Sequence, residues 1–229
     1  MLTASFMDIY LTQIKHYKCV NNIMGRHIHS IDNKVLDRIY GHGMGWVFVP
    51  ASFLDLGSRN AVASALKRHK KQGLIRQLAR GLYDYPRNDS QLGELSPSSD
   101  SIAMAMAGRD AVRLQPSGAH AANLLGLSDQ VPMKILYLTD GPSRTVRVGN
   151  KQISLKRTTP RNMAAAGKIS GLAIQALRYL GQSHVDEAII ARLDRRLDAD
   201  ARRQFLKELR YAPRWIADIM GRLGNGGNS

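Results

Sequence analysis

Residues 58–85 read SRNAVASALKRHKKQGLIRQLARGLYDY, and this stretch decides the fold of the N-terminal half. Ser58 is a good N-cap for a helix, and Gly73 is a typical residue to end it. The β-rich runs on either side of Arg80-Gly81 predict a hairpin that turns at these two residues. The stretch therefore predicts a helix followed directly by a two-stranded hairpin.

The residues before this stretch complete a known order of elements. Asp32 is the expected N-cap of a first helix that reaches Tyr40, and the apolar run 46–49 predicts a short strand. Pro50 suits the first position of a second helix. The order helix, strand, helix, turn, helix and hairpin predicts a winged helix-turn-helix domain over residues 31–86.

Composition divides the rest of the chain. Residues 1–30 are expected to form an N-terminal arm, and the Pro-, Ser- and Gly-rich residues 87–100 a linker. Residues 101–223 then form a second domain, and residues 224–229 a disordered tail. The linker indicates two units with their own cores.

The second domain is predicted to mix both kinds of secondary structure. Helices are expected at 101–107 and 116–125, and a strand at 134–138. A hairpin should turn at Gly149-Asn150, and the chain should be helical from Arg161 onward. The predicted fold class is therefore α+β, with an N-terminal winged helix-turn-helix domain and a C-terminal α/β domain that ends in a helical segment.

The helix after Ser58 has the division of side chains that a DNA-recognition helix requires. Its apolar face carries Val62, Ala65, Leu66 and His69. Early polar residues of such a helix contact base edges, so we expect base readout by Arg59, Asn60 and Ser64. We expect phosphate contacts from Lys67, Arg68, Lys70 and Lys71. Arg80 at the tip of the hairpin is expected to reach a phosphate or the minor groove, and Arg76 on the strand that leads there is also expected to contact DNA. Taken alone, the helix could equally be an ordinary amphipathic surface helix, and the hairpin that follows it favours the DNA-binding interpretation.

The charge of the chain supports a polyanionic partner. The 229 residues carry a net charge of +15, and residues 58–80 and 141–170 contain no acidic residue. A second basic patch is expected on the later hairpin, formed by Arg144, Arg147, Lys151, Lys156 and Arg157. This patch could contact DNA beside the operator, contact an RNA or nucleotide, or serve solubility alone.

Other classes of protein are disfavoured. The sequence contains no phosphate-binding loop and no dinucleotide fingerprint, so we expect neither catalysis nor a cofactor. The spacing of His16, Cys19, His27 and His29 matches no common zinc pattern, so no metal site is expected. A lone cysteine and no apolar run of membrane-spanning length predict a cytoplasmic protein without membrane contact.

Several motifs resemble the AbiEi-type antitoxins of bacterial type IV toxin–antitoxin systems. The resemblance extends over roughly residues 33–220 and is carried by the runs 73–83 (GLIRQLARGLY), 116–128 (PSGAHAANLLGLS), 130–132 (QVP), 137–141 (YLTDG) and 157–160 (RTTP). The first run is shared with many regulators, whereas the combination of the later runs is more specific.

The resemblance implies an autorepressor that binds inverted repeats of double-stranded DNA in its own promoter. It also implies a C-terminal domain that counters a nucleotidyltransferase-like toxin without forming a stable complex. We expect a monomer in solution or a weak dimer on DNA. The alternatives are an RNA-binding or RNA-modulating regulator that uses the basic region 141–168, and an enzyme whose site forms no recognisable motif.

Overall fold

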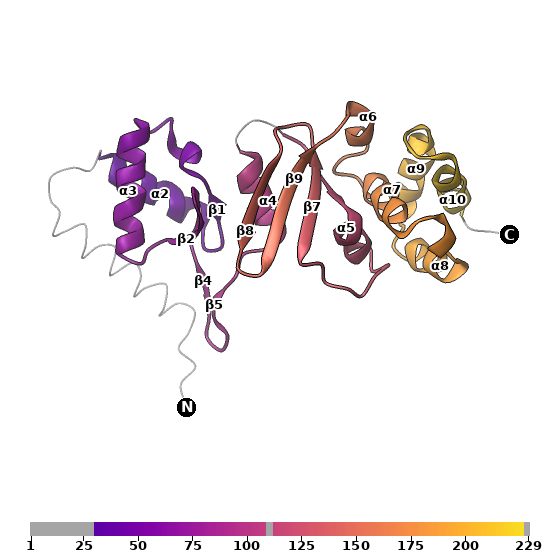
Figure 1. Cartoon of the computed structure of the whole chain (residues 1–229), viewed down its shortest axis with the longest axis horizontal. Helices are drawn as coiled ribbons and strands as arrows, with labels where there is room; N and C mark the ends of the chain where they lie inside the picture. The colour runs from indigo at the N-terminus through magenta and orange to yellow at the C-terminus, as the bar shows by residue number, and fades with distance from the viewer. Residues whose placement is uncertain (1–29, 109–111, 227–229) are drawn as a thin grey trace.

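The computed structural model describes residues 30–108 and 112–226 (Figure 1). The molecule is α+β, as predicted. A small helical unit with α2 and α3 lies at one end, a four-stranded sheet lies in the middle, and a group of helices closes the other end. The predicted N-terminal arm, except for Ser30, and the four residues weighed as a metal site fall within residues 1–29, outside the described part of the chain.

The N-terminal unit has the predicted order of elements. It contains α2 (Ile31–His42), β1 (Val47–Phe48), the 3-10 helix η1 (Pro50–Phe53), α3 (Arg59–Lys71), β2 (Arg76–Ala79) and β3 (Leu82–Asp84). The strands form an antiparallel sheet in the order β1-β3-β2. Its core is formed by Val35, Ile39, Phe48, Phe53, Val62, Ala65, Leu66 and Ile75.

Two details of this unit differ from the prediction. Ser30, and not Asp32, caps α2, because its side chain accepts the backbone N–H of Asn33. The predicted second helix is a single 3-10 turn, in which Phe53 is fully buried. The edge-to-face contact between Phe53 and Phe48, with ring centroids 5.3 Å apart, fixes this turn through tertiary packing.

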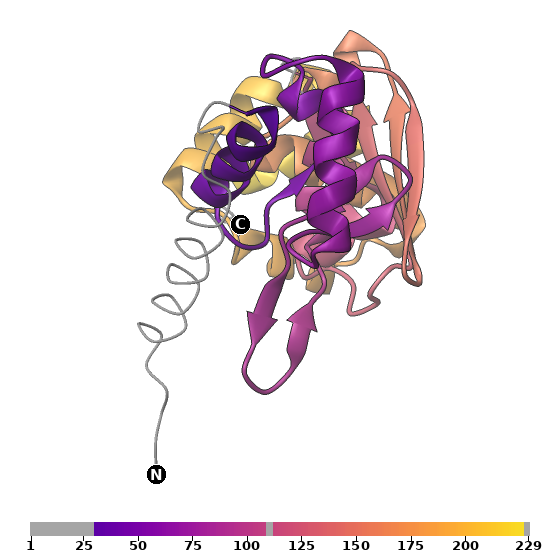
Figure 2. The same cartoon turned by 90° about the vertical axis from the view of Figure 1, so that its left-hand side faces the viewer.

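The predicted linker is partly regular structure. Residues 87–95 form a second hairpin from β4 (Arg87–Asp89) and β5 (Gly93–Leu95), which projects from the body in Figure 2. The Asp89 carboxylate accepts the backbone N–H groups of Gln91 and Leu92, which orders the turn and lowers the pKa of this carboxyl. The first part of the predicted linker therefore consists of strand and turn residues of a hairpin, and its last part is helical, because Ser98 caps α4 and the helix begins at Ser99.

The central sheet follows α4 (Ser99–Ala107). Its elements are β6 (Leu114–Ser117), α5 (Gly118–Leu124), β7 (Lys134–Thr139), β8 (Arg144–Val148) and β9 (Lys151–Arg157). The strand order is β6-β7-β9-β8, and only the β7–β9 pair is parallel.

The predicted helix at 116–125 begins two residues too early, since Pro116 and Ser117 belong to strand β6. β6 lies at an edge of the sheet, where a proline without an N–H is tolerated. The hairpin that turns at Gly149-Asn150 is confirmed.

Helices form the remainder of the described chain. They are α6 (Pro160–Met163), α7 (Ile169–Leu180), η2 (Gln182–His184), α8 (Glu187–Asp194), α9 (Ala199–Glu208), η3 (Leu209–Tyr211) and α10 (Arg214–Gly224). α5 and α7 to α10 enclose a core that includes Leu177, Leu193, Phe205, Ile216 and Met220. The last helix includes Gly224, which was predicted to start the disordered tail.

The two halves of the molecule share one hydrophobic cluster. Val47 and Leu82 of the N-terminal unit are buried together with Ile102 and Met106 of α4 and with Ile153 of β9. Leu78 and Ala79 of β2 pack against the same cluster, as do Val146 and Val148 of β8. Each half also has a cluster of its own, around Phe53 and around Phe205, so this third cluster joins the two halves. The wing needs the C-terminal half to cover its apolar face.

No helix in the described ranges 30–108 and 112–226 has both the length and the apolar character that a membrane crossing requires.

The shared cluster makes a prediction about stability. Ile102→Ala should lower the free energy of unfolding by about 2–5 kcal/mol, because Ile102 is only 3% exposed and its removal leaves a cavity. The transition should be followed by the fluorescence of Trp46 in a Trp215→Phe background, since the chain contains two tryptophans. The loss should appear at Trp46, although Ile102 belongs to the C-terminal half.

Met104→Ala is the control on the same helix. Its side chain is 68% exposed, so the change should stay within about 0.5 kcal/mol. A Trp46 transition that Ile102→Ala leaves unchanged would contradict the shared core.

Candidate nucleic-acid interface

Helix α3 is held by a buried apolar face. Val62, Ala65 and Leu66 are at most 1% exposed and pack in the cluster that contains Val35 and Ile39 of α2. The Ser58 side chain accepts the backbone N–H of Ala61 and caps the helix as predicted. This packing fixes the rotation of α3 about its axis and therefore determines which side chains face solvent.

The opposite face of α3 presents exposed polar and cationic side chains. Arg59, Asn60, Ser64, Lys67 and Lys71 are all exposed. Within the part of the chain that the structure describes, none of them forms an ion pair or a side-chain hydrogen bond. α3 itself contains no acidic residue. The face therefore combines uncompensated positive charge with free hydrogen-bonding groups, which is the composition needed to contact phosphates and base edges.

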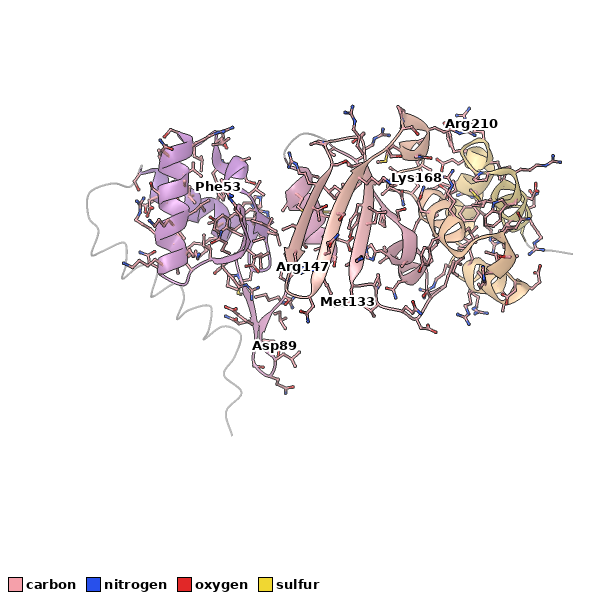
Figure 3. The ribbon with its side chains drawn as sticks, viewed as in Figure 1. Phe53, Asp89, Met133, Arg147, Lys168 and Arg210 are labelled. Carbon is pink, nitrogen blue, oxygen red and sulfur yellow. The ribbon has the colours of Figure 1, made fainter. Side chains whose placement is uncertain are left out.

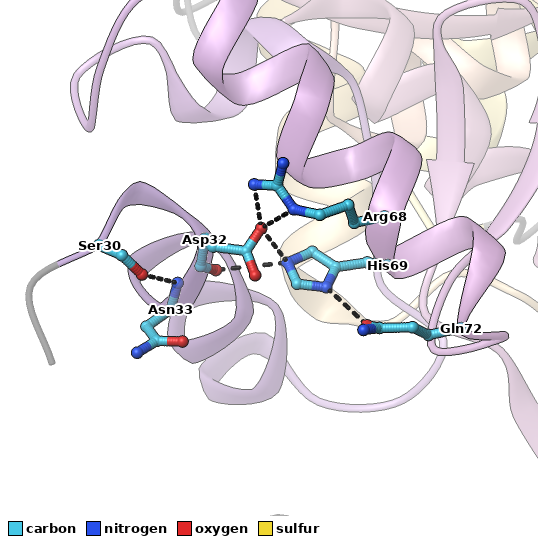
Figure 4. Close-up of polar contacts among 6 residues, drawn as sticks. All are labelled: Ser30, Asp32, Asn33, Arg68, His69 and Gln72. Atoms are coloured by element: carbon cyan, nitrogen blue, oxygen red, sulfur yellow. Dashed lines mark hydrogen bonds and ion pairs between the residues drawn. The ribbon is translucent and has the colours of Figure 1, made fainter. Parts of the chain in front are cut away.

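Arg68 is placed differently from its neighbours. Its Nε and Nη2 donate to the Asp32 carboxylate of α2 at 2.9 and 2.6 Å (Figure 4). The adjacent His69 is 1% exposed, and its Nε2 lies 3.3 Å from the backbone oxygen of Asp32. Asp32 thus joins the first turn of α2 to the last turns of α3. The charge of Arg68 is partly neutralised, so its predicted phosphate contact is weaker than that of Lys67.

Of the predicted contacts at the end of α3 and at the tip of the wing, Lys70 has a partner and Arg80 has none among the described residues. Lys70 donates through Nζ to Gln77 Oε1 at 2.6 Å, which links the end of α3 to β2. Because the partner is a neutral amide, Lys70 keeps its charge. Arg80 lies exposed in the two-residue turn between β2 and β3, where the positive φ of Gly81 permits the tight turn.

Arg76 has a structural role that the prediction missed. Its guanidinium donates to the Asp84 carboxylate at 2.6 Å, to Glu94 at 2.8 Å and to the backbone oxygen of Leu95 at 3.0 Å. Asp84 is only 1% exposed. The hydrogen bonds to Asp84, followed by the attraction of both carboxylates, raise the pKa of Arg76. Arg76 therefore clamps the wing to the second hairpin and is not placed as a free DNA contact.

A β-bulge explains why the sequence was misleading at Arg76. The register shifts between Gln77 and Ala79, so that Arg76 pairs with Asp84. In a regular hairpin that turns at the same two residues, position 76 would face position 85 instead. The bulge thus brings the arginine beside the buried aspartate.

The second basic patch does not form a single surface. Val146 pairs with Ile153 and Arg144 pairs with Leu155, so Arg144 lies on the face of the sheet that covers the shared cluster. There its Nη1 donates to the backbone oxygen of Met106. By the same alternation Lys151 and Arg157 belong to this face.

Arg147 and Lys156 lie on the opposite face, and both are exposed. Figure 1 shows α4 behind β8 and β9 and no helix in front of these two strands. The register therefore places Arg144, Lys151 and Arg157 on one face of the sheet and Arg147 and Lys156 on the other.

His120 is part of a hydrogen-bonded chain between elements. Its Nε2 lies 3.1 Å from the hydroxyl of Tyr137 on β7, and this hydroxyl donates to the carboxylate of Asp100 on α4. Burial lowers the pKa of His120 and raises the pKa of Tyr137. The arrangement satisfies buried polar groups between α4, α5 and β7.

Comparison with protein families gives a match over most of the chain. A model described as a family of unknown function, DUF6088, matches residues 34–204, which include α3, the wing and the central sheet. No curated protein matches the sequence.

The clamp formed by Arg76 generates a prediction. Arg76→Gln should lower the free energy of unfolding by about 3 kcal/mol, because it leaves the Asp84 carboxylate buried without its cation. Chemical denaturation would measure the loss. The double variant Arg76→Gln/Asp84→Asn should be more stable than Arg76→Gln alone, since it removes the unpaired charge.

Arg80→Gln provides the matched control within the same hairpin. Arg80 is exposed and unpaired among the described residues, so its loss should change stability by less than about 0.5 kcal/mol. Equal destabilisation by the two single variants would show that Arg76 is no more structural than Arg80.

Proposed function

This chain belongs to the DUF6088 family of unknown function, and from its own residues we propose that it is a double-stranded DNA-binding transcriptional repressor. The observation that carries the proposal is the exposed face of α3, whose cations are uncompensated and whose opposite face is anchored in a buried core. Arg59, Asn60 and Ser64 read bases, and Lys67 and Lys71 bind phosphates. Lys70, Arg80 and, more weakly, Arg68 add positive charge.

We further propose that the protein is the antitoxin of a type IV toxin–antitoxin system and acts in the cytoplasm. In this role it represses its own operon at inverted repeats and counters a nucleotidyltransferase-like toxin without a stable complex. The support is the resemblance of residues 116–160 to AbiEi-type antitoxins. The protein is then a monomer in solution or a weak dimer on DNA.

RNA binding through residues 141–168 is the second candidate. It is supported by the uncovered face of β8 and β9, which presents Arg147 and Lys156. It has less support than DNA binding, because the register places Arg144, Lys151 and Arg157 on the other face.

The first test separates base readout from phosphate binding. Arg59→Ala or Asn60→Ala should cost about 1–3 kcal/mol on duplex DNA from the upstream region of the gene, and much less on random duplex. Lys67→Ala or Lys71→Ala should weaken binding to both duplexes. Each should also reduce the slope of log affinity against log salt concentration by about one. Fluorescence anisotropy at several salt concentrations measures both effects.

Lys207→Ala on α9 is the control for a lost surface charge, because Lys207 is exposed and lies outside the N-terminal unit. If all four α3 variants lost affinity equally on both duplexes, the proposed readout by Arg59 and Asn60 would be wrong. Competition by structured RNA at lower concentration than duplex DNA would favour the second candidate.

The antitoxin role has its own test, which uses the full-length chain because the two halves share a core. A double variant Arg59→Ala/Asn60→Ala should lose promoter repression and still relieve growth arrest by the nucleotidyltransferase-like toxin that the proposal expects in the same operon. If the wild-type chain represses the promoter but does not relieve the arrest, the antitoxin role fails and DNA binding remains.

A further inference from the structure

A shallow notch lies in the C-terminal half, between α6, α7 and η3. Its cavity volume is only about 10 Å³, and its polar lining is formed by Arg161, Asn162, Gln175, Arg178 and Tyr211. This volume is about enough for one water molecule and far below the range of about 300–1,000 Å³ that is usual for sites of drug-sized ligands. A larger group therefore binds at the open mouth of the notch and not inside it.

Two arginines meet in this notch without an acidic partner. Nη1 of Arg178 donates to Asn162 Oδ1 at 3.1 Å, and Nη2 of Arg161 donates to the backbone oxygen of Arg210 at 3.2 Å. Neither guanidinium contacts a carboxylate of the described residues. Each therefore keeps most of its N–H donors free.

The structure holds these two cations close enough to repel each other. Burial, followed by the positive charge of Arg161, lowers the pKa of Arg178. Arg210, whose guanidinium carbon lies 4.9 Å from the ring centroid of Tyr211, adds a third positive charge beside the notch. An anion at the mouth of the notch would remove this repulsion.

The neighbouring side chains hold the notch in shape. Asn162 donates to Thr158 Oγ1 at 2.9 Å, which turns its carbonyl oxygen towards Arg178. Gly171 lines the floor, where a Cβ atom would lie 2.1 Å from the backbone oxygen of Ala165. The carboxylate of Glu208 is already bound by Lys168 and Ser170, so it does not neutralise the arginines.

We propose that this notch is a phosphate-binding site in which Arg161 and Arg178 grip one phosphate group. The planar guanidinium fork matches the geometry of phosphate oxygens, and the unpaired positive charge at the mouth of the notch attracts an anion. The site is separate from the α3 interface: Figure 3 shows Lys168 and Arg210 in the C-terminal half, at the far end of the molecule from Phe53. The phosphate belongs either to a free phosphate compound or to the backbone of a nucleic acid.

Isothermal titration calorimetry with the full-length protein tests the site. The probes are inorganic pyrophosphate, ATP and a short single-stranded RNA, all at one ionic strength. Arg161→Gln and Arg178→Gln should each weaken binding of the responding probe at least about tenfold. Arg178→Lys, which keeps the charge but loses the fork, should cause a smaller loss.

Arg192→Gln is the matched control, because Arg192 is an exposed arginine of the same half and has no ion pair among the described residues. It should change affinity by less than about twofold.

The probes distinguish the two sources of the phosphate. If the notch variants weaken binding of pyrophosphate and ATP, the phosphate belongs to a free phosphate compound. If they weaken binding of RNA and neither of the other two probes binds, the phosphate belongs to a nucleic-acid backbone. The proposal is overturned if the wild type binds none of the probes, or if Arg192→Gln weakens binding as much as the notch variants do. If Arg178→Gln fails to fold, Arg161→Gln decides, since its guanidinium donates only to one backbone oxygen.

Discussion

The packing of α4 is the constraint on which the arrangement of the molecule depends. Ile102, Ala103 and Met106 are buried, and the same cluster contains residues of β1 and β3 on one side and of β7 and β9 on the other. Neither the three-stranded wing sheet nor the four-stranded sheet covers its apolar face without this helix. Apolar burial is roughly proportional to the area removed from water, so separating the halves would expose the apolar faces of both. The orientation of α3 is therefore fixed relative to the C-terminal half.

Local patterns in the sequence were sufficient to predict the elements that local rules determine. The helix capped by Ser58, the turn at Arg80-Gly81 and the hairpin at Gly149-Asn150 all follow from capping and turn chemistry. The exposed face of α3 followed from helical periodicity alone. These features need no knowledge of distant residues.

The features that were missed depend on contacts between distant segments. Pro116 could not be assigned to a strand without knowing that β6 lies at a sheet edge. The ion pairs of Arg76 could not be predicted without knowing that a bulge brings Asp84 beside it and that Glu94 lies within reach. The notch is lined by residues of α6, α7 and η3. Its two arginines, Arg161 and Arg178, are 17 positions apart in the sequence and lie in segments without a shared motif. Charge clustering along the chain could not show which cations have acidic partners.

The cations of the chain fall into two groups, those paired with carboxylates and those without an acidic partner among the described residues. Arg68, Arg76, Arg113 and Lys168 are paired with carboxylates and hold elements together. The uncompensated charges that remain on α3 and at the notch lie at fixed positions in one rigidly packed molecule. A small anion at the notch interacts with α3 only across a distance that physiological salt screens. A nucleic acid long enough to reach both positions would instead bind the second at a high effective concentration once the first was occupied. If both positions bind as proposed, the shared core would make them nearly independent for small ligands and strongly linked for a polymer. The length of the polyanion would then determine whether the molecule acts as one binding surface or two.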